Sequence, residues 1–448
     1  MSDRHVKRYA AYKESGVEWL GEVPEHWKLT RNKEIFYERG ELSESGAETL
    51  LTVSHITGVT PRSEKNVNMF MAETMVGYKQ CRKGDLILNT MWAWMGALGT
   101  AKEDGICSPA YGVYAPRAFM PYNHAYFDYL YRTPKAVTEI TRNSKGIVSS
   151  RLRLYPKDFF QILTALPSFA EQTAIAAYLD TKTSQIDRQV ELLSKKATQY
   201  GKLKQSLINE TVTRGLDSTV PMKESEVEWI GEVPAHWEMK RLKELGKIQN
   251  SNVDKKTHPD EKAVRLCNYV DVYKNEFINS RLLQEFMLAT ADESEIKKFA
   301  VKQNDVLITK DSETADDIAI PALVTETLTG VLYGYHLAQI RTNSKKLFGP
   351  YLFRLFQSNS YNSRFEVSAK GITRVGLGQS AISDALTPVP PLPEQTAIAA
   401  YLDTKTAQID RIVSTINTQI DKLKELRKTL INDVVTGKIK VIPHGELA

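Results

Sequence analysis

Long apolar runs are absent from this sequence. No stretch approaches the roughly 20 apolar residues that a membrane-spanning helix requires. The N-terminal segment MSDRHVKRYAAYKESG also lacks the apolar stretch of a signal peptide. We therefore expect a soluble, cytoplasmic protein with no role at a membrane.

Cysteine and histidine are scarce. The three cysteines, Cys81, Cys107 and Cys267, are far apart and form no CxxC pair, which argues against a disulfide framework or a cysteine-based zinc site and favours buried thiols. The eight histidines show no spacing typical of metal ligands. The segment HPDEK at His258 is similar to a nuclease carboxylate cluster, but it lies in the stretch NVDKKTHPDEK, which is typical of a solvated loop. We expect no bound metal.

Motifs of nucleotide-handling enzymes are missing as well. The chain has no GxxxxGK[ST] phosphate loop, no GxGxxG after a strand, and no [ND]PP[YF] tetrapeptide of the kind that aminomethyltransferases use. A net charge of +5 and a pI near 8.7 permit a nucleic-acid partner without requiring one. We therefore expect no cofactor in this chain, and any catalysis has to come from partner proteins.

The sequence is instead rich in internal repeats. EQTAIAAYLDTKT begins at Glu171 and again at Glu394, an offset of 394 − 171 = 223. KESGVEWLGEVPEHW at Lys13 returns as KESEVEWIGEVPAHW at Lys223, and KGI occurs at 145 and 370. Between these repeats the two halves diverge. This chain of 448 residues therefore carries two different inserts in one repeated frame, which suggests one task performed twice on two targets.

A long helix is predicted after each EQTAIAAYLD. Apolar residues recur at alternating steps of four and three, as in the a/d seam of a coiled coil, although a helix packed on its own domain is the alternative. The seam positions are Ile186, Val190, Leu193, Ala197, Tyr200 and Leu207, and, 223 residues later, Ile409, Val413, Ile416, Ile420, Leu423 and Leu430. Lys204 and Arg427 interrupt the seam at one shared position and are candidates to fix its register.

The ends of these helices are also marked. Ser168 and Glu171 fit a capping box, and Pro393 suits a first helical turn. Gly215 and Gly437 follow the apolar pattern and are expected to end the two helices. A second expectation is a kink before Asp180 and Asp403, with each aspartate capping a second, longer helix.

The inserts are predicted to be mixed α/β domains. Short β-rich runs at 85–88 and 305–309 are bounded by polar or glycine-containing loops, and helical patterns follow. Both inserts are mildly basic, with 18 Lys/Arg against 13 Asp/Glu over 28–165 and 21 against 19 over 238–387. Trp27 and Trp237, and likewise Tyr178 and Tyr401 in the repeats, are expected to pack on their own domains more readily than to anchor a partner.

These features together resemble the DNA-specificity subunit of type I restriction-modification systems. The resemblance covers nearly the whole chain and is carried by the duplicated layout and by PPLPEQTAIAAYLD followed by a heptad helix; the first copy departs from it with LPSFAEQ at Leu166. It implies an α/β (mixed α+β) fold in which two similar target-recognition domains are separated by two long helices that pair as an antiparallel coiled coil. The predicted segments are 1–27, 28–165 (first recognition domain), 166–216, 217–237, 238–387 (second recognition domain) and 388–448.

The resemblance also implies a function. Each recognition domain would read one half of a split sequence in double-stranded DNA, and the paired helices would set the gap between the halves. Two methyltransferase subunits would dock on the repeats and bring S-adenosylmethionine, and restriction and motor subunits with ATP and Mg²⁺ would complete the complex. The alternatives from other classes are a self-sufficient DNA methyltransferase or nuclease, and a coiled-coil scaffold with two protein-binding domains.

Candidate DNA contacts lie in two places in each domain. The resemblance suggests the loops after the strands at 85–88 and 305–309, and the KGI turns place glycine beside basic and hydroxyl side chains that suit close contact with phosphate. Because Trp92 and Trp94 alternate as on a strand, core packing of one of them is an open alternative. The predicted residues are Asn89, Thr90, Trp92, Trp94, Lys145, Ser149, Ser150, Arg151 and Arg153 in the first domain, and Thr309, Lys310, Ser312, Lys370, Thr373 and Arg374 in the second.

Overall fold

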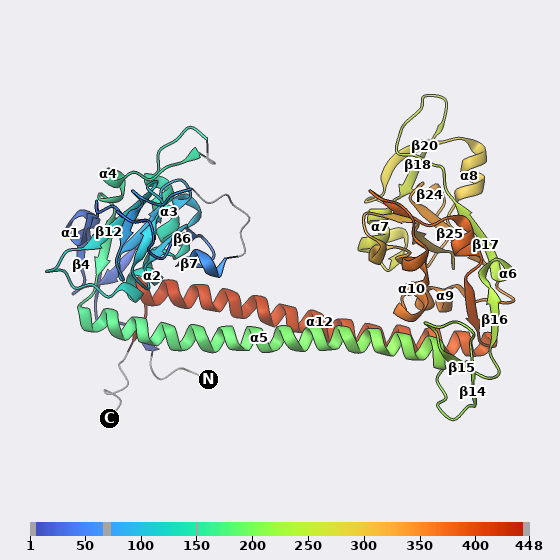
Figure 1. Ribbon diagram of the computed structural model, residues 1–448. Helices are drawn as coiled ribbons and strands as arrows, with labels where there is room; N and C mark the ends of the chain where they lie inside the picture. The colour runs from blue at the N-terminus through green and yellow to red at the C-terminus, as the bar shows by residue number, and fades with distance from the viewer. Residues whose placement is uncertain (1–5, 66–72, 149–150, 442–448) are drawn as a thin grey trace. The chain divides into compact units, whose positions relative to one another are not determined.

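The computed structural model describes residues 6–65, 73–148 and 151–441. The chain forms two compact units, Met1–Leu193 with Thr418–Ala448, and Ser194–Asn417. Each unit holds one insert together with part of each of two long helices, α5 (Phe169–Arg214) and α12 (Leu392–Val435) (Figure 1). Mixed α/β inserts joined to two long helices are the predicted fold class.

The insert of the first unit is built on an antiparallel sheet with strand order β10-β9-β12-β5. On the central strand β9, Leu86 and Leu88 belong to the core that also contains helix α2, whereas Ile87 belongs to a second core. Because both faces of such a strand are buried, its sequence is an uninterrupted apolar run. The elements of this insert are β4 (Lys28–Arg31), α1 (Asn32–Ile35), β5 (Phe36–Glu38), β6 (Leu51–Ser54), β7 (Gly58–Pro61), β8 (Lys79–Cys81), β9 (Leu86–Asn89), β10 (Leu98–Thr100), β11 (Gly105–Cys107), β12 (Tyr111–Pro116), α2 (His124–Tyr131), α3 (Pro134–Asn143), α4 (Pro156–Phe159) and β13 (Leu163–Leu166).

The insert of the second unit repeats this plan with additions. Its main sheet has the order β17-β25-β21-β23-β19, and a second sheet has the order β20-β18-β24. Val306 and Ile308 on β21 face one core and Leu307 faces another, as on β9. The elements are β16 (Glu238–Arg241), α6 (Leu242–Leu245), β17 (Gly246–Asn250), β18 (Lys262–Cys267), α7 (Tyr269–Lys274), β19 (Phe277–Ile278), β20 (Met287–Ala291), α8 (Glu293–Phe299), β21 (Val306–Thr309), β22 (Asp311–Ser312), β23 (Pro321–Val324), β24 (Val331–Tyr333), β25 (Leu337–Thr342), α9 (Gly349–Phe356), α10 (Asn359–Ser368), β26 (Val375–Gly376), α11 (Gln379–Ser383) and β27 (Leu386–Val389).

The repeated segments form small hairpins at the base of each unit. Strand β2 (Tyr12–Glu14) pairs with β3 (Glu22–Pro24), and β14 (Met222–Glu224) pairs with β15 (Glu232–Pro234). In the first unit, β1 (Val6–Lys7) also pairs with β28 (Lys440–Val441). Trp27 and Trp237, which follow the two hairpins, are completely buried, so the prediction of core packing is confirmed.

The long helices follow the predicted seam but contain no kink. Every seam position is buried or half-buried, and the capping box of Ser168 with Glu171 is formed. The expectation of a kink with an aspartate cap is wrong, because α5 runs unbroken through Asp180 and α12 through Asp403. Each aspartate instead accepts hydrogen bonds from its insert, from the Tyr129 hydroxyl at 2.8 Å and from the Arg354 guanidinium at 2.7 Å.

The helices α5 and α12 run side by side and antiparallel in each unit (Figure 1), and an equivalent ion pair joins them in both units. In the first unit Arg427 contacts Asp187, with Nε 2.9 Å from Oδ1. In the second unit Lys204 Nζ lies 2.9 Å from Oδ2 of Asp410. Both 427 − 204 and 410 − 187 equal 223, the offset of the helical repeat. The two basic residues that interrupt the seam are therefore equivalent, and each meets an acidic residue of the opposite helix.

The repeated glutamate connects the helix start to the repeated hairpin. Glu171 accepts hydrogen bonds from Trp27 Nε1 at 3.3 Å and from His26 Nε2 at 2.9 Å. Glu394 makes the equivalent contacts with the Trp237 indole at 3.1 Å and with the adjacent histidine at 2.8 Å. Two distant repeats, HW and EQ, thus recur together because they form one contact.

The repeated glutamine connects the helix start to the insert. Gln172 and Gln395 are fully buried, and each side chain accepts from one backbone N–H and donates to two backbone carbonyls. Gln172 accepts from Asn123, whereas Gln395 accepts from Phe348, two residues with different side chains. Because only backbone atoms are bound, one unchanged glutamine can hold two inserts of different sequence.

Candidate nucleic-acid interface

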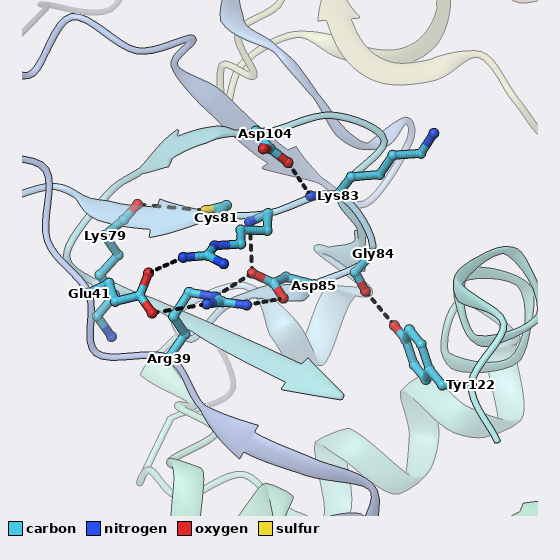
Figure 2. Close-up of polar contacts among 10 residues, drawn as sticks. Arg39, Glu41, Lys79, Cys81, Lys83, Gly84, Asp85, Asp104 and Tyr122 are labelled. Carbon is cyan, nitrogen blue, oxygen red and sulfur yellow. Dashed lines mark hydrogen bonds and ion pairs between the residues drawn. The ribbon is translucent and has the colours of Figure 1, made fainter. Parts of the chain in front are cut away.

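A buried aspartate anchors the strand that leads to the predicted recognition loop in the first insert (Figure 2). Asp85 accepts hydrogen bonds from Arg39 Nε at 2.7 Å and Arg39 Nη2 at 3.0 Å, and from the backbone N–H of Arg82 at 2.8 Å. The Asp85 hydrogen bonds raise the pKa of Arg39, so the guanidinium stays charged. Nearby, the Tyr122 hydroxyl donates to the carbonyl of Gly84 at 2.6 Å. These contacts fix the turn from which β9 starts.

Asp305 does the same in the second insert with a different arginine. It accepts from Arg341 Nε at 2.8 Å and Nη2 at 2.7 Å, and from the backbone N–H of Lys302 at 2.7 Å. Arg341 lies on β25, whereas Arg39 follows β5, which occupies the place of β17 in the first sheet. The same bidentate anchor is therefore reached from two different strands.

The loop after β9 is not the strand that the alternation of its tryptophans suggests. Residues Ala93–Met95 form a 3₁₀ turn in which Ala93 is buried, and Trp92 is 50% exposed. The half-buried Trp94 donates its indole N–H to the carbonyl of Met91 at 3.0 Å. A left-handed glycine after the turn, Gly96 with φ of 87°, reverses the chain into β10 and so removes the strand periodicity.

The polar residues of the two loops differ in exposure. In the first insert Asn89 is buried at the strand end, and Thr90 donates its hydroxyl to the carbonyl of Ala110 at 2.8 Å. In the second insert Thr309 and Ser312 are buried, and Thr309 accepts from the backbone N–H of Ile320. The side-chain amide of Asn89 and the hydroxyl groups of Thr90, Thr309 and Ser312 therefore support the two loops. Lys310 is half-buried.

The KGI segments form equivalent turns that are closed by a pair of backbone hydrogen bonds. Lys145 pairs with Arg153, and Lys370 pairs with Gly376. A Cβ atom on Gly371 would lie 1.9 Å from the carbonyl oxygen of Arg374, and one on Gly146 would lie 2.8 Å from that of Arg151. Only glycine allows the returning chain to pass so closely. Ser149 and Ser150 lie outside the described residues.

Each KGI turn lies beside the other predicted contact region of its insert, which is the loop after β9 or after β21. In the first insert the backbone N–H of Leu154 donates to the carbonyl of Thr90 at 3.2 Å. In the second, β22 pairs with β26, and Arg374 Nη2 lies 3.2 Å from Oδ1 of Asp311. The exposed predicted residues of the loop and the KGI turn thus belong to one surface in each insert: Trp92, Lys145, Arg151 and Arg153 in the first, and Lys370, Thr373 and Arg374 in the second.

Sequence reasoning missed His336, a buried residue that lies beneath the second surface. Its Nδ1 lies 2.6 Å from Oδ1 of Asp311, and its ring packs 3.9 Å from that of Tyr335. Burial lowers the pKa of His336, against the opposing effect of the Asp311 carboxylate. His336 precedes β25, 25 residues from Asp311, and no spacing in the sequence indicates their contact.

Within 6–65, 73–148 and 151–441, no group of three or more His, Cys, Asp or Glu side chains is arranged to hold a metal ion. Nor does any helix in these ranges have the length and apolar character needed to cross a membrane.

Comparison with known proteins agrees with these features. Residues 234–422 match the family model of the type I restriction modification DNA specificity domain. The chain is 24% identical over 292 residues to the type I restriction enzyme MjaVIII specificity subunit of Methanocaldococcus jannaschii, covering 64% of each chain. It is 22% identical over 289 residues to the StySPI specificity subunit of Salmonella potsdam, covering 63% of this chain and 59% of that one. The chain thus spans about three fifths of the length of these curated relatives.

Solved structures share the fold. A chain from a study of complex assembly and conformational transition of the type I R-M system has a TM-score of 0.69 at 16% identity, covering 92% of this chain and 98% of that chain. The HsdS subunit from Thermoanaerobacter tengcongensis has a TM-score of 0.55 at 16% identity, covering 93% and 98%. In its duplicated frame, in the domain matched over 234–422 and in this fold, the chain is similar to type I restriction-modification DNA-specificity subunits.

Proposed function

We propose that this chain is the DNA-specificity subunit of a type I restriction-modification complex and that it recognises a split sequence in double-stranded DNA. The observation that carries the proposal is the pair of equivalent surfaces, each made of a KGI turn and a neighbouring loop, on inserts of different sequence. Lysine and arginine at these turns suit phosphates and base edges. Two different readers on one duplicated frame match a target with two different halves.

The partners follow from the frame. The segments around Trp27 and Trp237 and the starts of α5 and α12 are nearly identical, so two copies of one methyltransferase subunit would find two equivalent docking surfaces. Half-buried Tyr178 and Tyr401 lie in this repeated part. The restriction and motor subunits would join the same complex. S-adenosylmethionine, ATP and Mg²⁺ would be bound by the partners, and this chain would be non-catalytic.

A domain exchange tests the proposal. Residues 28–165 are replaced by the matching region of a relative, and methylated adenines are mapped in DNA from cells that express the complete system. We expect one half of the methylated sequence to change and the other to stay. Exchange of 238–387 is the matched control and should change the opposite half. If both halves change in either chimera, or neither does, independent reading is the wrong description.

A further inference from the structure

The tip of each KGI turn presents an isoleucine to solvent. Ile147 is 103% exposed and Ile372 is 105% exposed relative to an extended reference, more than any other large apolar side chain among the described residues. Scattered exposed apolar residues are ordinary on protein surfaces. Here, however, the two isoleucines occupy equivalent positions, 225 residues apart, in inserts whose sequences otherwise differ.

The backbone around each isoleucine holds it outward. Immediately before the glycine of each turn, a lysine closes the turn through backbone hydrogen bonds: Lys145 pairs with Arg153, and Lys370 pairs with Gly376. The close approach of the returning chain to Gly146 and Gly371 then leaves no room on the inner side of the turn. The residue after the glycine is therefore projected from the tip. The same construction occurs in both inserts although the first turn is longer: it closes between Lys145 and Arg153, whereas the second closes between Lys370 and Gly376.

The surroundings of the tips indicate DNA as the occupant. Each isoleucine lies between an exposed lysine and an exposed arginine, Lys145 and Arg151 in one insert and Lys370 and Arg374 in the other. In double-stranded DNA, negatively charged phosphates surround stacked bases, so the cationic side chains can contact the phosphates while the apolar side chain contacts the bases. Proteins that insert isoleucine, leucine or methionine between base pairs partly unstack the step and bend the duplex.

We propose that Ile147 and Ile372 are wedges, each of which enters the DNA of one half-site and partly unstacks a base step there. This inference rests on the proposed function. A side chain shared by two readers of different sequences cannot supply their difference in specificity, so it serves a step that both half-sites need. Chemistry on a base requires that the base leave the stack, and a wedge beside it lowers the cost of that movement.

The test uses the complex of this chain with its methyltransferase subunits and a duplex that contains the mapped target sequence. 2-Aminopurine is placed at successive positions in each half-site, because its fluorescence rises when the base is unstacked. With the wild-type chain we expect one bright position in each half. Ile147→Ala should remove the signal only in the half read by 28–165, and Ile372→Ala only in the other. Each variant should bind the duplex about tenfold more weakly, since an apolar contact is lost.

Two controls separate the wedge from other roles. Ile56→Ala removes a different exposed isoleucine of the first insert and should leave binding and fluorescence unchanged. In a plot of the logarithm of the binding constant against the logarithm of salt concentration, Lys145→Ala should reduce the slope by about one. Ile147→Ala should leave this slope unchanged, because no charge is lost. Wild-type fluorescence retained in both isoleucine variants overturns the proposal, as does failure of these variants to assemble with the methyltransferase subunits, which would make the tips protein contacts. Absence of sequence-specific binding by the wild-type complex would instead refute the proposed function.

Discussion

Replacement of Arg354 by alanine is expected to loosen the second insert from helix α12. The Arg354 side chain is 2% exposed, and its guanidinium donates to Oδ1 of Asp403 from Nε at 3.0 Å and from Nη2 at 2.7 Å. It also donates to Oε1 of Gln357 at 2.7 Å and packs 5.0 Å from the ring centre of Phe353. One substitution therefore removes two charge-assisted hydrogen bonds, one neutral-acceptor bond and the packing of the arginine stem.

The magnitude depends on what remains after the substitution. Breaking a fully buried ion pair costs about 3–5 kcal/mol because the partner charge stays buried. Asp403 is 52% exposed and regains water, so we expect a smaller loss of about 2–3 kcal/mol. Arg354→Met keeps most of the packing and should lose only about 1–2 kcal/mol. Arg354→Lys should fall between them, since the single ammonium group of lysine cannot reproduce the two fixed N–H donors that converge on Oδ1 of Asp403.

Hydrogen exchange measured by mass spectrometry provides the assay, because a chain of two units has no single unfolding free energy. In Arg354→Ala, amides of 349–356 and of 392–417 should exchange roughly 30-fold faster for a loss of 2 kcal/mol. Peptides of the first unit serve as the internal reference.

The equivalent position in the first insert supplies a matched variant. Tyr129 occupies the place of Arg354 at the repeat offset of 225 and donates one hydrogen bond to Asp180. Tyr129→Phe should cost only about 0.5–1.5 kcal/mol, and only in the first unit. A change below about 1 kcal/mol in Arg354→Ala, or an equal change in both units, would refute the reasoning.

Three further outcomes follow from local contacts. Burial raises the pKa of Glu171, but the hydrogen bonds from its partners outweigh burial and hold the pKa below 4.5. The resulting stability of the first unit is present above about pH 4.5 and is lost as the pH falls through the lowered pKa. Glu171→Gln should lack this pH-dependent stability when acid unfolding is followed by tryptophan fluorescence. Asp187→Arg and Arg427→Asp should each lower the stability of the first unit, measured by hydrogen exchange, and the double variant should restore it. The coupling free energy should be about 0.2–1 kcal/mol because the pair is exposed; additive losses would contradict the pairing. Gly371→Ala should weaken DNA binding about tenfold or more, since the turn cannot close around a Cβ atom. Hydrogen exchange in the remainder of the second insert should be unchanged, and undiminished binding would exclude a role for this turn.

Much of the frame is determined by local sequence. The heptad pattern from Ile186 onward, the capping box at Ser168 and the glycines after the helices specify where the long helices begin, pair and end, because each signal acts within a few turns. The repeat offset also identifies equivalent residues, such as Lys204 and Arg427, without any coordinates. The mixed α/β class of the inserts follows from short apolar runs that are bounded by turns.

Contacts between distant segments were decided only by the tertiary structure. Asp180 is a good cap by local rules, yet the hydroxyl of Tyr129 binds it and the helix continues. Trp92 and Trp94 have strand spacing, yet a buried alanine and a left-handed glycine make the segment a 3₁₀ turn. In the second insert the loop and the KGI turn share one surface because β22 pairs with β26. The exposure of Ile147 and Ile372 depends on the close approach of a backbone carbonyl group to the preceding glycine. In each case the competing partner lies outside the window in which periodicity and propensity act, so only the folded chain brings the two together.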